Sequence, residues 1–199
     1  TGLGLIDASS IFENLNPDMV VVVGDRFEMM SVTLAAAYMN IIVVHTMGGE
    51  VTGTIDESIR HSITKLAHIH FPANEDAKKR IIKLGEDENY VFNVGCPRID
   101  LIANELKKNS IRVLKNLFKN YKGVGKEFNI TKEPFLLVSQ HPVTTEFGNN
   151  RVQIEKTLEA LNKIKMRTIM LWPNADAGSD DISSGIRTFK DNNDCKWLF

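Results

Sequence analysis

Residues 19–46 read MVVVVGDRFEMMSVTLAAAYMNIIVVHT, and this stretch decides the fold. Met19–Val23 is a β-branched apolar run that stops at Gly24, a pattern typical of a buried strand. Phe27–Met39 then holds helix-forming residues over a helical length, and Ile41–Val44 repeats the strand pattern. A strand, a helix and a strand in this order predict a parallel β-α-β unit, since both faces of such strands are buried by crossover helices.

The same alternation continues along the rest of the chain. Further strands are predicted at His68–Phe71, Tyr90–Val94, Phe135–Ser139, Thr168–Trp172 and Lys196–Phe199. Further helices are predicted at Ile55–Ala67, Glu75–Leu84, from Ile99 onward, at Arg151–Lys163 and at Asp181–Phe189.

The stretch from Asn120 to Glu133 loses periodicity and gathers glycine and lysine, which predicts a linker. We therefore expect a doubly wound α/β fold in two units, residues 1–120 and 134–199, joined by a linker at 121–133. The apolar end of the chain resembles a strand cut short, so we expect a fragment of a longer protein.

The composition excludes several classes of partner. The charged side chains, 24 Lys and Arg against 25 Asp and Glu, leave a net charge of -1, which favours neither nucleic acid nor an anionic membrane. The longest apolar run, residues 29–44, falls short of the roughly 20 residues that a membrane span needs. Cys96 and Cys195 lie far apart without a CxxC pair, which indicates neither a disulfide framework nor a zinc site. We expect a cytoplasmic protein with no metal and no resident cofactor.

Candidate functional residues follow the predicted strands, because ligands of open α/β sheets bind beyond the carboxyl ends of the strands. Polar residues occupy four such places: Gly24–Glu28, His45–Glu50, Gln140–Thr145 and Pro173–Ser179.

Asp25 and Asp56 each allow two interpretations. Asp25 stands three residues before Glu28, the spacing of a capping box, and Thr54 and Glu57 repeat that spacing. Asp56 would then be a first-turn acid favoured by the helix dipole. Both carboxylates can also point into the crevice, because a cap at the carboxyl end of a strand faces it, and two acids there suit proton transfer.

The remaining candidates also have ordinary alternatives. Arg60 and His61 share one predicted helix, where they are either ligands or part of a solvated face. His141 directly follows a predicted strand and precedes Pro142, which fixes the backbone after it. Asp176–Ser179 opens a helix whose N-terminal amides suit an anion, unless an Asp or Ser merely caps that helix.

Five stretches together resemble the hydrolysing UDP-N-acetylglucosamine 2-epimerases, the first enzymes of sialic acid and related nonulosonic acid synthesis. In the order of that family they are Gly24–Glu28, Gly53–His68, Gly95–Pro97, His141–Thr145 and Pro173–Ser179. The resemblance covers nearly the whole chain, and the second stretch is similar to the hydrolysing branch rather than to the non-hydrolysing epimerases.

The resemblance implies two Rossmann-like domains of the glycosyltransferase B type, both incomplete in this chain, with a UDP-sugar bound in the cleft between them. It also implies a homo-oligomer. The family's N-terminal strand with its basic loop and its Ser-rich nucleotide-binding motif are missing from this sequence, so we expect the fragment by itself to be inactive.

The reaction implied by the resemblance is anti elimination of UDP across C1 and C2 of the sugar, followed by hydration of the glycal to N-acetylmannosamine. Asp25 and Asp56 match two catalytic carboxylate positions of the family. Met47 matches a third position, where many members carry Glu, and a thioether cannot exchange protons. Either Glu50 or another group takes that role, or the substrate differs, or this copy is impaired.

The resemblance thus makes Asp25, Asp56, Glu50 and His141 the expected catalytic residues. The residues expected to bind substrate are Arg26, His45, Met47, Arg60, His61, Asn174, Asp176 and Ser179. Three alternatives remain open: the same chemistry on a 2,4-diacetamido-trideoxy nucleotide sugar, a retaining glycosyltransferase of the same fold, and a non-catalytic nucleotide-sugar-binding module.

Overall fold

The computed structural model describes residues 1–108, 116, 123–195 and 198. These residues form two compact units, Thr1–Ala103 and Asn104–Phe199. The first part of the predicted linker and, apart from Leu198, the strand predicted at Lys196–Phe199 lie outside the described residues. The linker boundary at 121–133 remains a prediction.

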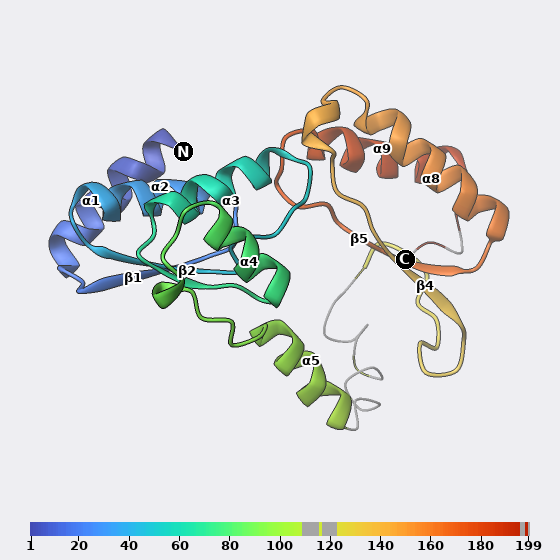
Figure 1. Cartoon of the computed structure of the whole chain (residues 1–199). Helices are drawn as coiled ribbons and strands as arrows, with labels where there is room; N and C mark the ends of the chain where they lie inside the picture. The colour runs from blue at the N-terminus through green and yellow to red at the C-terminus, as the bar shows by residue number, and fades with distance from the viewer. Residues whose placement is uncertain (109–115, 117–122, 196–197, 199) are drawn as a thin grey trace. The chain divides into compact units, whose positions relative to one another are not determined.

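The first unit is built on a parallel sheet of three strands in the order β1 (Met19–Val23), β2 (Ile42–Thr46) and β3 (Ile69–Phe71) (Figure 1). Val22 lies opposite His45, which in turn lies opposite His70 in the register. All three strands were predicted from their short apolar runs, and the parallel pairing that these runs predict is confirmed.

Helices α2 (Phe27–Tyr38) and α3 (Ile55–Leu66) connect these strands, and α4 (Glu75–Lys83) follows the third strand. The helices bury small and branched side chains against the inward side of β1 and β2, which excludes water from the sheet. The buried members of this core are Val22, Ala36, Val43, Ile63 and Ala67.

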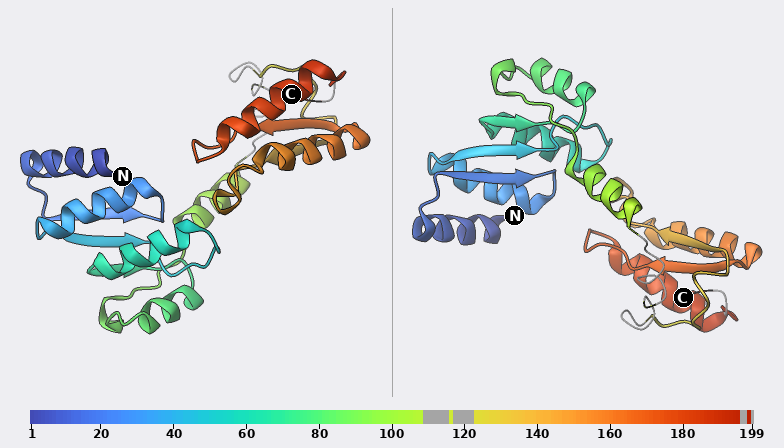
Figure 2. Two further views of the ribbon diagram at one scale, coloured as in Figure 1. Left: turned by 90° about the horizontal axis from the view of Figure 1, so that it is seen from above. Right: turned by 90° about the horizontal axis from the view of Figure 1, so that it is seen from below.

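The sequence did not predict α1 (Gly2–Leu15), which packs against α2 (Figures 1 and 2). Ala8 is its only buried residue, two glycines weaken its first turn, and apolar residues also lie on its exposed side, so no single apolar face marks the helix in the sequence. The Ser31 hydroxyl of α2 donates a hydrogen bond of 2.8 Å to the Thr1 carbonyl oxygen, and α1 ends at Asn16 in the left-handed conformation.

The strand predicted at Tyr90–Val94 is wrong. A 3-10 helix, η1 (Glu88–Tyr90), occupies its start, because the Asp87 side chain accepts a hydrogen bond from the Asn89 N–H and turns the backbone. Only Val91 pairs with the sheet, through a parallel bridge to His70. The next helix, α5 (Pro97–Lys107), begins two residues before the predicted Ile99.

The second unit contains a parallel pair of strands, β4 (Phe135–Ser139) and β5 (Arg167–Leu171), and two helices that pack together, α8 (Asn150–Ile164) and α9 (Ser179–Asn192) (Figure 2). A short 3-10 helix, η2 (Thr144–Glu146), follows β4. Thr168 of β5 also forms a parallel bridge with Leu198. The core between the two helices consists of Ile154, Leu158, Ile182 and Ile186.

Candidate functional site

Asp25 follows β1 directly and forms an ion pair with Arg60 of α3. The contact joins Arg60 Nη2 to Asp25 Oδ2. The Arg60 side chain is only 4% exposed, whereas 26% of the Asp25 side chain reaches solvent. A buried cation therefore holds one side of the carboxylate while part of that side chain stays open to solvent.

Arg60 also reaches the loop that follows β2. Its Nη1 donates to the Glu50 carbonyl oxygen at 2.7 Å and lies 3.5 Å from the Thr52 hydroxyl. Burial lowers the pKa of Arg60 from its usual range, although the group remains a cation at any pH at which proteins fold. The expectation of a solvated face is therefore wrong for Arg60.

His45, expected to bind substrate, is fully buried beneath the same loops. Its Nε2 lies 2.8 Å from the Gly24 carbonyl oxygen, and its Nδ1 lies 3.4 Å from the Thr64 hydroxyl. Burial lowers the pKa of His45 to about 4, so the ring is neutral at pH 7. Its Nε2–H therefore donates to Gly24, the residue before Asp25.

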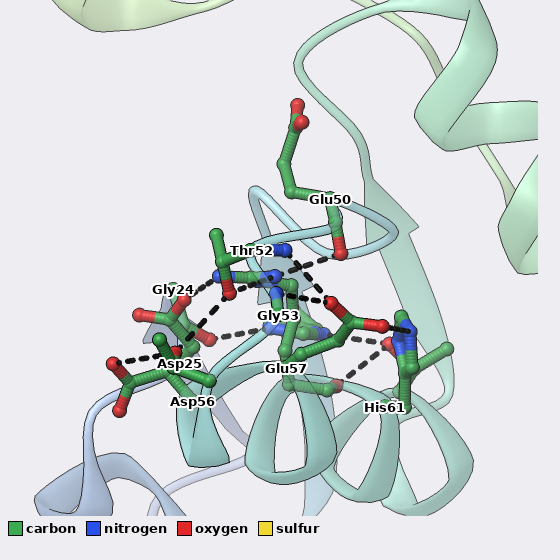
Figure 3. Close-up of polar contacts among 12 residues, drawn as sticks. Gly24, Asp25, Glu50, Thr52, Gly53, Asp56, Glu57 and His61 are labelled. Atoms are coloured by element: carbon green, nitrogen blue, oxygen red, sulfur yellow. Dashed lines mark hydrogen bonds and ion pairs between the residues drawn. The ribbon is translucent and has the colours of Figure 1, made fainter. Parts of the chain in front are cut away.

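Asp56 lies in the first turn of α3 and accepts a hydrogen bond of 3.3 Å from the Thr54 hydroxyl. Figure 3 shows its carboxylate on the same side of the cluster as that of Asp25. The structure thus brings together the two acids that the sequence singled out, and the first-turn interpretation of Asp56 is compatible with this position.

The hydrogen bonds at the starts of α2 and α3 differ from those of the predicted capping boxes. Helix α2 begins after Arg26 without a side-chain cap, and Asp25 contacts Arg60, so the interpretation of Asp25 as a cap is wrong. Thr54 is the N-cap of α3 but its side chain does not cap the helix. The Glu57 carboxylate instead accepts from the Gly53 and Thr52 N–H groups at 2.7 and 2.8 Å, as drawn in Figure 3. These two amides lower the pKa of Glu57.

Met47 and Glu50 lie in the loop between β2 and α3. Met47 has a φ of 61°, in the left-handed region that few residues other than glycine adopt, and its N–H donates to the Phe71 carbonyl oxygen at 2.9 Å. The Glu50 carboxylate accepts from the Asn74 side chain at 2.7 Å and points away from Asp25 (Figure 3). The structure therefore joins Glu50 to Arg60 through the Glu50 backbone carbonyl oxygen and not through its carboxylate.

Two further predicted ligands lie at the rim of this cluster. His61 Nε2 lies 3.8 Å from the Glu57 carboxylate, on the side away from Asp25 (Figure 3). Arg26 pairs with Glu28 at 3.2 Å, and its guanidinium lies 5.5 Å from the centroid of the Phe27 ring.

In the second unit, a hydrogen bond joins His141 to Asn174, two of the four site residues predicted there. His141 Nδ1 accepts a hydrogen bond of 3.1 Å from the Asn174 N–H, which ties the ends of β4 and β5 together. Because Nδ1 accepts, the ring proton sits on Nε2, 3.1 Å from the Ser139 hydroxyl. His141 is exposed, so its ring is accessible from solvent beyond the end of β4.

Asp176 and Ser179 lie at the start of α9. The Asp176 carbonyl oxygen accepts from the Ser179 N–H at 3.0 Å, and Gly178 occupies the N-cap position with a φ of 92°. The alternative of an ordinary Asp or Ser cap is therefore wrong, since a residue without a side chain occupies that position.

The sequence did not single out Thr52 or Thr64. Thr64 lies four residues after Arg60, so the two share a face of α3, and its hydroxyl donates to the Arg60 carbonyl oxygen at 3.0 Å. This spacing was the available signal for Thr64. Thr52 joins the site only because its loop folds back onto Arg60.

Among the residues that the structure describes, no group of three or more His, Cys, Asp or Glu side chains is arranged to hold a metal ion. Within the same residues, no helix combines the length and the apolar character needed to cross a membrane. Cys96 and Cys195 are free thiols.

Comparison with solved structures defines the class of fold. The chain superposes on a UDP-N-acetylglucosamine 2-epimerase from Neisseria meningitidis bound to UDP-N-acetylglucosamine, with a TM-score of 0.71 and 20% identity over 94% of this chain and 50% of that one. The enzyme of Methanocaldococcus jannaschii gives a TM-score of 0.72 with 19% identity over 99% of this chain and 52% of that one. The fold is that of the glycosyltransferase B type, as predicted.

Sequence comparison then gives the family. The family model described as UDP-N-acetylglucosamine 2-epimerase matches residues 1–196. A UDP-N,N'-diacetylbacillosamine 2-epimerase (hydrolyzing) of Legionella pneumophila is 37% identical over 98% of this chain and 49% of its own length. The GDP/UDP-N,N'-diacetylbacillosamine 2-epimerase (hydrolyzing) of Campylobacter jejuni is 38% identical over 94% and 47%. The UDP-N-acetylglucosamine 2-epimerase of Neisseria meningitidis is 32% identical over 87% and 43%.

The chain belongs to the UDP-N-acetylglucosamine 2-epimerase family. It spans about half the length of the curated relatives that it matches.

Proposed function

We propose that the protein carrying this chain is a hydrolysing nucleotide-sugar 2-epimerase. It converts a UDP-linked 2-acetamido sugar and water into UDP and the free sugar with inverted configuration at C2. The observation that supports this most is the pair of carboxylates, Asp25 and Asp56, on one side of a cluster whose buried Arg60 holds the first of them.

The proposed chemistry needs groups of this kind. The C2 proton of the sugar is weakly acidic, so a positioned base must accept it while the C1–oxygen bond to UDP breaks and a C1–C2 double bond forms. Water then adds its hydroxyl to C1, and an acid returns a proton to the opposite face of C2. We assign these two proton transfers to Asp25 and Asp56, and the support of the departing diphosphate to His141 through its Nε2–H.

Two substrates are candidates. UDP-N-acetylglucosamine is the substrate that the family description names, and a relative from Neisseria meningitidis carries that activity in its name at 32% identity. UDP-N,N'-diacetylbacillosamine is favoured by the higher identity, 37% over 98% of this chain, to the Legionella pneumophila relative. Because either substrate is a nucleotide sugar, we place the enzyme in the cytoplasm. From the resemblance to the family we expect it to be a homo-oligomer.

The test is turnover of both UDP-sugars by the protein at the full length of its relatives, in deuterium oxide. We expect release of UDP and one deuterium at C2 of a manno-configured product, since elimination and hydration exchange that hydrogen. A glycosyltransferase would leave C2 protonated and need an acceptor, and a binding module would bind UDP without releasing it from either sugar. Failure to release UDP from every UDP-linked 2-acetamido sugar, and GDP from every GDP-linked one, would refute the proposal.

A further inference from the structure

We propose that Arg60 is a positioning residue, which orients the Asp25 carboxylate and the loop after β2 for the reaction instead of binding the sugar or the diphosphate. The inference rests on the proposed function and departs from the expectation, drawn from the family resemblance, that Arg60 contacts substrate.

Protein groups occupy the guanidinium of Arg60. Its Nη2 faces the Asp25 carboxylate, and its Nη1 faces the Glu50 carbonyl oxygen at 2.7 Å. The residue as a whole is 3% exposed. Both terminal nitrogens therefore have protein acceptors, and the side chain offers almost no surface to a ligand. A buried cation that is paired and hydrogen-bonded in this way is satisfied within the protein.

Arg60 also connects α3 to the loops that follow β1 and β2. Asp25 belongs to the loop after β1, Glu50 belongs to the loop after β2, and Arg60 belongs to the second turn of α3. One side chain thus joins α3 to the loop before it and to a loop 35 residues earlier in the sequence. Since the catalytic carboxylate has to meet a C–H bond in a fixed direction, a displacement of about 1 Å is enough to cost on the order of 10²-fold in rate.

Asp25 is fixed from two sides. Arg60 holds its carboxylate, while the buried His45 holds the Gly24 carbonyl oxygen one residue earlier at 2.8 Å. The Thr64 hydroxyl connects these two supports, because it donates to the Arg60 carbonyl oxygen at 3.0 Å and lies 3.4 Å from His45 Nδ1. The arrangement restricts the backbone and the side chain of Asp25 together.

Arg80 provides a matched control. Its Nη1 donates to the Gly49 carbonyl oxygen, so it supports the same loop as Arg60 without contacting Asp25. In the full-length enzyme, we expect Arg60→Lys and Arg60→Ala to lower kcat about 10²-fold while KM and the affinity for UDP stay within about threefold. Arg80→Ala should lower the melting temperature but change kcat less than about threefold.

Coupling to Asp25 gives a sharper test. If Arg60 acts through that carboxylate, then adding Arg60→Lys to Asp25→Asn should cost much less than it costs in the wild type, because the two variants remove one unit. Guanidinium ion added to Arg60→Ala should restore part of kcat. Additive losses, or a loss that lies mainly in KM and UDP affinity, would overturn the positioning role in favour of direct substrate contact.

A measurement without substrate separates this inference from the proposed function. Hydrogen exchange of the unliganded protein should be faster in Arg60→Lys at residues 24–28 and 50–53, and in Arg80→Ala only at residues 48–51. Unchanged exchange at residues 24–28 would overturn the inference even if the enzyme is active. Faster exchange there in a protein that turns over no UDP-sugar would support the inference about Arg60 and refute the function.

Discussion

Asp25 and Asp56 have different partners, so replacing each with asparagine separates proton transfer from folding. Asp56 accepts from the Thr54 hydroxyl, a bond that an Asn side-chain oxygen can also accept. We expect Asp56→Asn to lose about 10² to 10⁴-fold in turnover while melting within a few degrees of the wild type. Turnover and melting temperature measured on the same preparation provide the test, and normal turnover would mean that Asp56 is only a first-turn acid.

Asp25→Asn should behave differently, because it removes the anionic partner of the buried Arg60. We expect a similar loss of turnover together with a loss of about 1 to 3 kcal/mol in the free energy of unfolding. Urea unfolding compared with that of Asp56→Asn measures the difference. Equal stability of the two variants would show that the ion pair contributes little to folding.

His141 is the residue for which we expect binding and turnover to change together. His141→Ala removes the acceptor of the Asn174 N–H and the Nε2–H, and should weaken UDP binding about tenfold or more, which corresponds to about 1.5 to 3 kcal/mol. In His141→Asn, the new side-chain oxygen can still accept from Asn174. Calorimetry should therefore give equal loss in both variants if the Nε2–H faces the diphosphate, and restored binding in His141→Asn would assign the effect to the backbone contact instead.

The position of Asp25 could be predicted from the sequence, whereas the role of Arg60 could not. The residue after a buried strand lies at the ligand-binding edge whatever else the fold contains. Which face of α3 is buried depends on the packing of that helix, and two adjacent residues have different environments there. Arg60 is buried against Asp25, while His61 faces Glu57 at the rim. Resemblance to the family marked both residues but gave no orientation.

At the scale of elements, strands were predicted well where apolar residues ran without interruption, as in β1 and β2. The failures occurred where local hydrogen bonds or contacts with other helices decide the structure. The Asp87 side chain turns the backbone into a 3-10 helix where the predicted strand should begin, and apolar residues on the exposed side of α1 obscure the face that packs against α2.

Gly148 before α8 and Gly178 at the start of α9 form a matched pair of glycines for a stability prediction. Gly148 and Gly178 have φ angles of 94° and 92°, so alanine is strained at both. A Cβ at Gly148 meets nothing within 4 Å, whereas one at Gly178 would clash with Asn150 Nδ2, a buried atom. We expect Gly148→Ala to cost about 1 to 2 kcal/mol, and Gly178→Ala to cost distinctly more.

Thermal unfolding of the two glycine variants tests this difference. Equal destabilisation of the two variants would mean that Asn150 and the start of α9 move apart without a cost in free energy. The close approach of Gly178 to Asn150 would then not fix the start of α9.

At the scale of the whole molecule, the histidines are divided unequally between the two compact units. The two buried histidines, His45 and His70, both lie in the first unit, and the only histidine of the second unit, His141, is exposed. Burial is the main cause that lowers the pKa of each buried ring, and it outweighs the opposing effect of Glu86 on His70. A lower pH should therefore reduce the stability of the first unit more than that of the second.

The lowered pKa of His45 means that acid destabilises the folded state. Between pH 6.5 and about 4 the unfolded state binds a proton at His45 that the folded state does not, so stability is complete above pH 6.5 and falls as pH decreases. From pH 7 to pH 5 the loss from this one group is about 2 kcal/mol, and His70 adds to it in the same direction. Carboxylates that have lowered pKa values, such as Glu57, contribute only at lower pH.

Tryptophan fluorescence reports on the second unit, because both tryptophans of this chain, Trp172 and Trp197, belong to it, whereas far-UV circular dichroism reports on the helices of both units. We expect urea unfolding by far-UV circular dichroism to shift to lower urea from pH 7 to pH 5, while the tryptophan fluorescence transition moves much less. In His45→Gln, whose amide can still donate to the Gly24 carbonyl oxygen but does not titrate, the free energy of unfolding lost between pH 7 and pH 5, obtained from the circular dichroism transition, should be smaller by about 2 kcal/mol. An unchanged shift in that variant, or coincident transitions by both signals, would show that the acid sensitivity is not located at His45 or that the two units unfold as one.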